Sequence, residues 1–268
     1  MNILITGSNG FVGRNLKQYL GYFNYNIYTV THNELDILCL DTLKEFIKKN
    51  NINIIIHTAI KGGRRIKQDD ISTFNQNIAM WENIVDAGKD CKLIINFGSG
   101  AEFDRRFPVN KAIPENIFNV LPIDYYGLSK NLISRSIYKI DNAVNLRIFN
   151  CFGRDEGIDR FITSCVLKDT IEIFEDKLFD FFYIEDLCKI IQFYIDKSNI
   201  PLKDINCVYP NKYRLSEIAN KLNVSKITIV KTTENHYTGS ANQLQDLGIS
   251  LFGLDFGLQK MRSLKHEI

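Results

Sequence analysis

"NILITGSNGFVG", residues 2–13, joins an apolar, β-branched run to a stretch with helical spacing through three glycines. Gly7 would permit a tight turn, Gly10 would let backbone amides approach a pyrophosphate, and Gly13 would let the helix pack closely on the strand. Many turns carry glycine, but three glycines placed between a first strand and a first helix are typical of dinucleotide-binding units. The stretch therefore predicts a Rossmann-type fold.

The same alternation of short apolar runs and longer amphipathic stretches continues to about residue 150. Strands that are this uniformly apolar belong to a parallel sheet with helices on both faces. We therefore expect an α/β protein with a doubly wound parallel sheet. The expected strands are 2–6, 26–30, 52–59, 92–98 and 143–149, and the expected helices are 11–20, 41–49, 71–88 and 126–140.

After residue 150 the alternation loosens, and the chain divides into two expected regions. Residues 1–150 would form the dinucleotide-binding Rossmann domain, and residues 151–268 would mainly form a smaller C-terminal substrate-binding lobe. The segment 181–208 would return to the Rossmann sheet. Residues 237–257 are rich in Gly, Asn and Gln and are expected to form a loop with short helical turns.

Composition excludes several classes of protein. The chain has 268 residues and a net charge of +2, with 33 basic and 31 acidic residues mixed along its length, so no nucleic-acid surface is expected. Neither a leader nor a membrane-spanning apolar run is evident, and the four histidines show no metal-ligand spacing. We expect a cytoplasmic protein without a metal site or a membrane partner. The cysteines are scattered singly and are interpreted as small buried hydrophobes in a reducing compartment: Cys39, Cys91, Cys151, Cys165, Cys188 and Cys207.

The end of the second strand indicates which dinucleotide is bound. NAD-binding units usually place Asp or Glu there, but this sequence has Thr31, His32 and Asn33. Arg14 follows Gly13, where a guanidinium could reach a 2′-phosphate. We therefore expect residues 1–150 to bind NADPH, with NADH as the alternative. In the competing interpretation, Arg14 is a solvated helix residue and His32 is a loop residue. Asp36 and Ile37 would border the adenine, although Asp36 could equally cap a helix.

Three side chains suggest proton-transfer chemistry. Tyr126 and Lys130 in "YYGLSK" lie one helical turn apart, and an ammonium there would lower the pKa of the phenol toward the working range. Ser99 lies at the end of the strand 92–98, on the sheet edge where a nicotinamide would bind. Alone, the pair would be explained by aromatic packing beside a surface lysine, but the glycine loop and Ser99 precede it.

At this point the chain resembles the extended short-chain dehydrogenase/reductase family, in its nucleotide-sugar branch of epimerases, dehydratases and 4-keto reductases. The resemblance extends almost from end to end, through "TGSNGFVG", "IIHTAIKGG", "NFGSGAEFD", "YYGLSK", "LRIFNCFG" and "DFFYIEDL". It implies that Ser99 hydrogen-bonds the sugar carbonyl or hydroxyl and that Tyr126 exchanges its proton. Lys130 would hold the nicotinamide ribose and tune Tyr126.

The resemblance also implies the binding residues. The cofactor contacts would be Gly7, Asn9, Gly10, Phe11, Val12, Gly13, Arg14, His32, Asp36, Ile37, Thr58, Ala59, Lys61, Tyr126 and Lys130. The substrate contacts would be Lys61, Gly100, Ala101, Glu102, Asn150, Arg154 and Arg160. Asn150 could instead be a turn residue, and the two arginines could be solvated. Asn77 would organise the edge of the site or belong to a surface polar face. Phe179 stands where the family usually has Arg before Asp180, which removes one nucleotide contact.

The sequence lacks several acidic, basic and epimerising groups that related enzymes use, and this excludes some of the family's reactions. The family's dehydratases carry Asp and Glu directly after the catalytic Ser or Thr, where this sequence has Gly100 and Ala101, so elimination is not expected. Glu102 is one step too late and, on a strand, would point to the opposite face from Ala101. The GDP-fucose synthase group, which the chain resembles most, epimerises with a Cys and a His, and here Ala101 and Arg160 replace them. The resemblance therefore implies reduction of the C4 ketone of a nucleotide-activated 4-keto-6-deoxy sugar, without C3/C5 epimerisation.

Two other functions stay open. A nucleotide-sugar 4-epimerase with tightly bound NAD needs only the same three residues, and a non-catalytic dinucleotide-binding protein is the other alternative. Family members dimerise through a four-helix bundle, and the helices around 72–88 and 126–140 carry apolar residues on more than one face. A homodimer is expected from this, although those residues could equally be interior. They include Ile78, Trp81, Ile84, Ile133 and Ile137.

Overall fold

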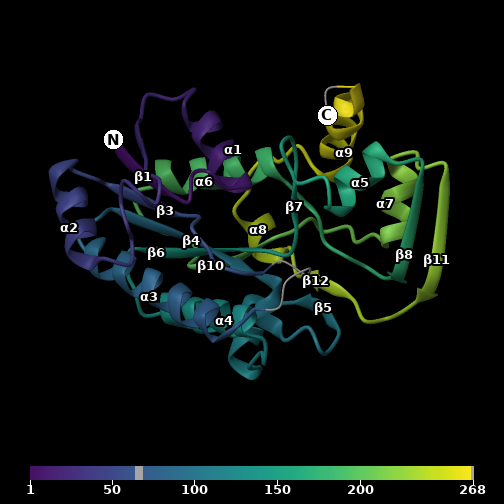
Figure 1. The fold of residues 1–268 in the computed structure, drawn as a ribbon, viewed down its shortest axis with the longest axis horizontal. Helices are drawn as coiled ribbons and strands as arrows, with labels where there is room; N and C mark the ends of the chain where they lie inside the picture. Colours follow the sequence, from purple (N-terminus) through teal and green to yellow (C-terminus); the bar gives the residue numbers. More distant parts are fainter. Residues whose placement is uncertain (64–68, 267–268) are drawn as a thin grey trace.

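A computed structural model describes residues 1–63 and 69–266, and in this part of the chain six parallel strands form the central sheet, in the order β10-β6-β4-β3-β1-β2 (Figure 1). Its strands are β1 (Asn2–Thr6), β2 (Asn26–Thr29), β3 (Ile54–His57), β4 (Leu93–Ser99), β6 (Ala143–Ile148) and β10 (Asp204–Cys207). The order reverses direction at β1, which is the doubly wound arrangement. The expected α/β fold with a parallel sheet is therefore confirmed.

Helices cover both faces of the sheet, as the apolar strands require. On one face lie α1 (Phe11–Leu20) and α6 (Ile184–Asp196), which contact each other. On the other lie α2 (Leu40–Lys49), α3 (Ile71–Ala87) and α4 (Tyr125–Ile137), packed side by side (Figure 1). The side chain of Asp70 caps α3 through the Thr73 amide, and Asp124 caps α4 through the Gly127 amide. These caps satisfy amide groups that helix starts leave open.

The remaining elements gather beyond the carboxyl ends of β4 and β6. A parallel pair, β8 (Thr170–Asp176) and β11 (Lys226–Thr232), lies at the far end of the molecule with α7 (Leu215–Lys221) against it (Figure 1). The other elements are β5 (Val109–Ala112), β7 (Cys151–Phe152), α5 (Phe161–Leu167), β9 (Phe182–Tyr183), β12 (Tyr237–Gly239), α8 (Asn242–Asp246) and α9 (Leu254–Ser263), with the 3₁₀ turns η1 (Gly100–Phe103), η2 (Pro114–Asn119) and η3 (Leu264–His266).

Three sequence expectations need correction. Residues 237–257 are not mainly loop, because β12 pairs with β5, a strand that its mixed polar sequence did not reveal, and α8 and the start of α9 follow. The segment after Ser99 is a 3₁₀ turn rather than a continuing strand. Cys39 is exposed, whereas the other five cysteines are buried as expected.

One hydrophobic core joins the sheet to the later elements. It contains Ile5 of β1, Leu146 of β6, Ile173 of β8 and Met261 of α9, all buried. β10 pairs with β6 in parallel, so the chain returns to the central sheet after residue 200. The boundary at residue 150 therefore divides the sequence without dividing the core. In the part of the chain that is described, no helix has the length and apolar character needed to cross a bilayer.

A buried ion network fixes the last two strands of the sheet to the turn after β4. Arg147 of β6 is fully buried and donates to Glu102 through Nε at 2.7 Å and to Asp204 through Nη2 at 2.7 Å. Asn145 bridges the same region, because its Nδ2 donates to Asp204 while its Oδ1 accepts from Asn96. Buried charges are tolerated only when they are paired in this way.

The Arg147→Met substitution should lower the free energy of unfolding by about 3–5 kcal/mol, because it leaves two buried carboxylates without their cation. Urea denaturation at pH 7 would measure the loss. Arg262→Met, on the exposed side of α9, is the matched control and should change stability by less than about 0.5 kcal/mol. A loss below about 1 kcal/mol for Arg147→Met would contradict the interpretation.

Candidate active site

The glycine turn between β1 and α1 has the expected tight conformation. Gly7 has a φ of +67°, and a Cβ on it would lie 2.6 Å from Ala59 Cα. A Cβ on Gly13 would lie 2.6 Å from the Gly7 carbonyl oxygen, so only glycine allows the helix to pack this closely. Gly10 begins α1 without a side-chain cap, and no acidic residue lies in the first turn. The start of this helix therefore has the features of an anion-binding site.

Ser99, Tyr126 and Lys130 converge at the carboxyl edge of the sheet. Ser99 ends β4, and its side chain lies beside the Tyr126 hydroxyl, where it acts to lower the pKa of the phenol. Tyr126 and Lys130 lie on the same face of α4, one turn apart. The Nζ of Lys130 donates to the Phe97 carbonyl oxygen at 2.7 Å, which brings the ammonium beside β4. The fold therefore brings Ser99 together with Tyr126 and Lys130, which follow it later in the sequence, to form one constellation.

Burial dominates the protonation of this constellation. It lowers the pKa of Lys130 from 10.5 to about 8, against the opposing effect of the Glu102 carboxylate. It raises the pKa of Tyr126, although the Ser99 side chain opposes the rise. Burial therefore outweighs any lowering of the Tyr126 pKa by Lys130 in this state of the protein. The charges that act on the phenol include those of Glu102, Arg105 and Asp69, while the Lys130 ammonium is directed to the Phe97 carbonyl.

The loop after β3 closes one side of the constellation. Gly63 lies against the Tyr126 ring, since a Cβ on it would approach Cε2 to 2.7 Å. Asn77 is buried, which removes the surface alternative: its Oδ1 accepts from the Lys61 amide at 2.9 Å, and its Nδ2 donates to the Lys61 carbonyl at 3.0 Å and to Ser129 Oγ at 3.2 Å. Asn77 therefore ties this loop to α4.

His57, at the end of β3, is an uncharged neighbour of the constellation. Burial and the Lys130 ammonium lower its pKa to about 3. Its ring is hydrogen-bonded to Thr6 Oγ1 at 2.9 Å. A neutral imidazole here adds no further positive charge beside Lys130.

Two of the residues expected at the adenine end, Arg14 and His32, are exposed, and Asp36 is half-buried. The Nη1 of Arg14 donates to the Asn9 carbonyl at 2.6 Å. His32 is 76% exposed and lies 3.5 Å from Asp36. Asp36 accepts from the Leu38 amide and does not cap α2, whose N-cap is Cys39. Their role in cofactor binding stays a prediction.

The fold places the residues expected to contact the substrate in different surroundings. Asn150 and Arg160 are brought together, because Arg160 Nη2 donates to Asn150 Oδ1. Arg154, on the loop after β7, is exposed. Gly100 and Ala101 are buried in η1, where a Cβ on Gly100 would lie 2.6 Å from the Tyr237 hydroxyl.

The expectation for Glu102 needs correction. It was expected on a strand and among the substrate contacts, but its side chain is fully buried. The 3₁₀ turn directs its carboxylate inward to Arg147 and to the Ser99 amide. A carboxylate held in this way is not available to a substrate.

Several residues near the site were not found by sequence reasoning. Lys212 is buried and pairs with Asp180 at 2.8 Å, and the Gly239 amide donates to the same carboxylate at 2.8 Å. Tyr237 packs on Phe149 and Phe179. These residues come from segments far apart in the chain, and no motif spacing links them. Arg147, inside the quoted "LRIFNCFG", and Asp180, which opens the quoted "DFFYIEDL", lay within motifs that could have drawn attention to them.

Known proteins were compared with the sequence and the fold. The sequence matches the model of the NAD dependent epimerase/dehydratase family over residues 3–207. It is 24% identical to the GDP-L-colitose synthase of Yersinia pseudotuberculosis, over 81% of this chain and 79% of that protein. MlghC, a GDP-mannoheptose C4 reductase from Campylobacter jejuni with NADP bound, has a TM-score of 0.82 at 18% identity, covering 100% of this chain and 98% of that one. A GDP-L-fucose synthetase from Naegleria fowleri has a TM-score of 0.79 at 14% identity, covering 99% and 94%.

The buried ammonium should make stability depend on pH. Between about pH 8 and 10.5 the unfolded chain keeps a proton on Lys130 that the folded protein has released, so folding becomes more favourable as pH rises through this window. The stability of the wild type relative to Lys130→Met should therefore increase from pH 7 to pH 10, as measured by urea denaturation. Lys139→Met, an exposed lysine just after α4, is the control and should show no such trend. A flat difference for Lys130→Met would refute the assignment.

Proposed function

We propose that this chain, which belongs to the NAD dependent epimerase/dehydratase family, uses NADPH to reduce the C4 ketone of a nucleotide-activated 4-keto-6-deoxy sugar. The observation that carries the proposal is that the Ser99 side chain lies beside the Tyr126 hydroxyl and acts on its pKa, with Lys130 on the same helix face. A phenol and a hydroxyl within reach of each other can both donate to one carbonyl oxygen. Polarising and then protonating a ketone needs this pair.

The residues of the glycine turn fit NADPH. Gly7 and Gly13 have no room for a side chain, and the uncapped start of α1 offers backbone amides to a pyrophosphate. Arg14 would contact the 2′-phosphate, and Lys130 would hold the nicotinamide ribose. When bound, the cofactor supplies the hydride. The presence of NADP in the MlghC structure supports this choice.

The protonation of the site suits reduction. The new alkoxide needs a proton, and the burial that raises the pKa of Tyr126 keeps the phenol protonated at neutral pH. Ser99 would hydrogen-bond the same oxygen as charge develops on it. Lys130 carries a proton below about pH 8, so its ammonium would stabilise the phenolate that remains.

The groups needed for competing reactions are replaced at the corresponding positions. Gly100 and Ala101 cannot act as acid or base, and Tyr237 packs against Gly100 from the other side. Arg160 donates to Asn150, and a guanidinium has no acceptor atom, so it cannot act as the base that epimerisation requires. C3 and C5 would therefore be left unchanged.

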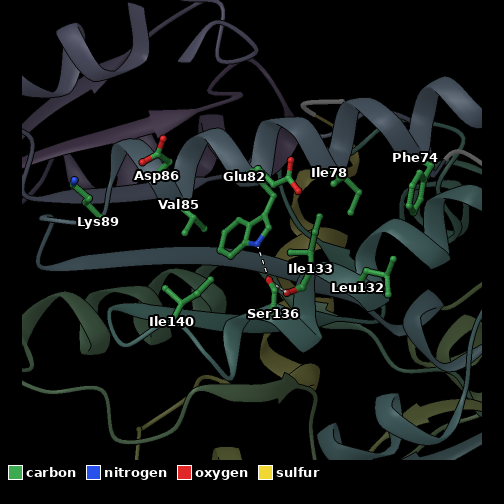
Figure 2. A pocket seen from close by; sticks show the side chains of 11 residues that line it. Phe74, Ile78, Glu82, Val85, Asp86, Lys89, Leu132, Ile133, Ser136 and Ile140 are labelled. Atoms are coloured by element: carbon green, nitrogen blue, oxygen red, sulfur yellow. Dashed lines mark hydrogen bonds between the residues drawn. The ribbon is translucent and has the colours of Figure 1, made fainter. Parts of the chain in front are cut away.

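We further propose that the protein is a homodimer. An apolar groove of about 620 Å³ lies between α3 and α4, where Ile78, Val85, Leu132 and Ile140 line it beside Trp81 (Figure 2). The indole of Trp81 is fixed by its hydrogen bond to Ser136 Oγ at 2.8 Å (Figure 2). A second copy related by a two-fold axis would present the same apolar face and form a four-helix bundle.

Turnover would test the reductase directly. The purified protein should oxidise NADPH when given a panel of 4-keto-6-deoxy nucleotide sugars, measured by absorbance, with NMR showing that C4 alone changes, from a ketone to an alcohol of one configuration. Tyr126→Phe should lower kcat by at least about 100-fold while leaving NADPH affinity nearly intact, because it removes the proton donor alone. Tyr125→Phe, the adjacent exposed tyrosine, is the control and should retain activity.

Other outcomes would identify the alternatives. Full activity of Tyr126→Phe would refute the catalytic role. Tightly bound NAD in the purified protein, with C4 epimer formation and no net NADPH oxidation, would establish the 4-epimerase. Binding of NADPH without turnover of any substrate in the panel would favour the non-catalytic protein.

The dimer is tested by mass. The wild type should show twice the 30.9 kDa chain mass by light scattering, and Leu132→Glu should convert it to a monomer because a carboxylate would be buried in the bundle. Phe174→Glu, on the exposed face of β8, should remain dimeric. A monomeric wild type at micromolar concentration would contradict the proposal.

A further inference from the structure

The fully buried carboxylate of Glu102 connects the ion network of the fold to the candidate catalytic groups. One oxygen, Oε1, accepts from the Ser99 backbone amide at 2.7 Å. The other, Oε2, accepts from Arg147 Nε at 2.7 Å. Both oxygens act as acceptors, which is the pattern of an ionised carboxylate. The negative charge of Glu102 is therefore held in the interior, one turn from the residue that would bind the sugar oxygen.

The backbone around Ser99 is shaped to admit this carboxylate. Gly98 precedes Ser99, and a Cβ on it would lie 2.6 Å from Glu102 Oε1 and 2.6 Å from Asn145 Nδ2. In return, the Ser99 side chain accepts from the Ala101 amide at 3.2 Å, so Ser99 and Glu102 hold each other across η1. Ser99 is thus fixed from both its backbone and its side chain.

The charge of Glu102 acts on both Lys130 and Tyr126. It raises the pKa of Lys130 against the effect of burial, and it raises the pKa of Tyr126. Arg105 and Asp69 also face the phenol with opposite signs, and His57, beside Lys130, is neutral. The second carboxylate of the network, Asp204, contacts Arg147 and Asn145, whereas Glu102 contacts Arg147 and the Ser99 amide.

We propose that Glu102 is a positioning residue: its buried carboxylate, held by Arg147, fixes the Ser99 amide and supplies the negative charge that Lys130 and Tyr126 face. The proposal rests on the proposed reductase function. It differs from a purely structural ion pair in its effect on protonation. If Glu102 only stabilised the fold, removing its charge would leave the titration of Lys130 unchanged.

Two variants separate these roles. Glu102→Gln is isosteric and removes the charge, whereas Asp204→Asn removes the other carboxylate from the same guanidinium. Both perturb the ion network of Arg147. Only Glu102→Gln should shift the chemistry, because Glu102 contacts the Ser99 amide and its charge acts on Lys130.

The first measurement needs no substrate. Lysine labelled with ¹³C at Cε reports its own protonation by NMR in the free protein, and Lys130→Met assigns the signal. The pH at which Lys130 titrates should fall in Glu102→Gln and remain that of the wild type in Asp204→Asn. An unchanged titration in Glu102→Gln would overturn the proposal, even if no sugar in the panel is turned over. Failure of the reductase assignment alone would leave this result intact.

The second measurement uses the substrate identified by the panel. In Glu102→Gln, kcat should fall between about 10- and 100-fold, with little change in KM, as expected for the loss of one buried charge-assisted hydrogen bond. The alkaline limb of the pH profile should move to lower pH, because Lys130 and Tyr126 lose their protons earlier. A kcat within two-fold of the wild type and an unmoved limb would contradict the proposal.

Glu102→Asp decides the matter if Glu102→Gln does not fold. It keeps the charge but shortens the side chain, so Lys130 should titrate as in the wild type while kcat falls about 10-fold through loss of the Ser99 contact. A kcat within two-fold of the wild type in this variant would overturn the positioning role. Thermal unfolding of each variant confirms that the comparison is made between folded proteins.

Discussion

The pairing of Arg147 with two buried carboxylates is the constraint on which the rest of the structure depends. Taking these charges out of water is costly, and the cost is offset only if the guanidinium keeps both partners at hydrogen-bond distance. Glu102 lies in the turn directly after β4, Arg147 lies on β6 and Asp204 begins β10, so the network joins three strands and holds the turn at the carboxyl end of β4. The carboxyl edge of the sheet therefore has a defined shape before any ligand binds.

That edge determines how the candidate catalytic groups behave. Elementary chemistry suggests that an ammonium beside a phenol lowers its pKa, but here desolvation of Tyr126 outweighs it and Lys130 is directed to a carbonyl. The result is a protonated phenol beside a serine hydroxyl, which suits a proton donor better than a base. The burial of Tyr126 in this fold therefore favours a phenol that donates its proton to an oxygen.

The C-terminal elements complete the site from another direction. Tyr237 of β12 reaches Gly100, and the Gly239 amide donates to Asp180, so a late segment of the chain packs directly behind the turn that follows Ser99. Lys212 pairs with Asp180 in the same region, next to Phe179. One continuous core runs beneath both regions. The lobe and the sheet thus form the site together.

The sequence by itself determined the parallel sheet and the glycine turn, because hydrophobic periodicity and short motifs are local properties of the chain. The meeting of Ser99 with Tyr126 and Lys130 was implied only by a family resemblance, and the fold brings them together. Neither β5 nor the 3₁₀ turn at Glu102 could be predicted, since a mixed polar strand is defined by its partner and a single residue of register decides which way a side chain points. The inward direction of Glu102 and its pairing with Arg147 were decided only by the tertiary structure. Pairing across more than forty residues depends on how strands are ordered in space, and burial, which sets the protonation of the site, exists only once the chain has folded.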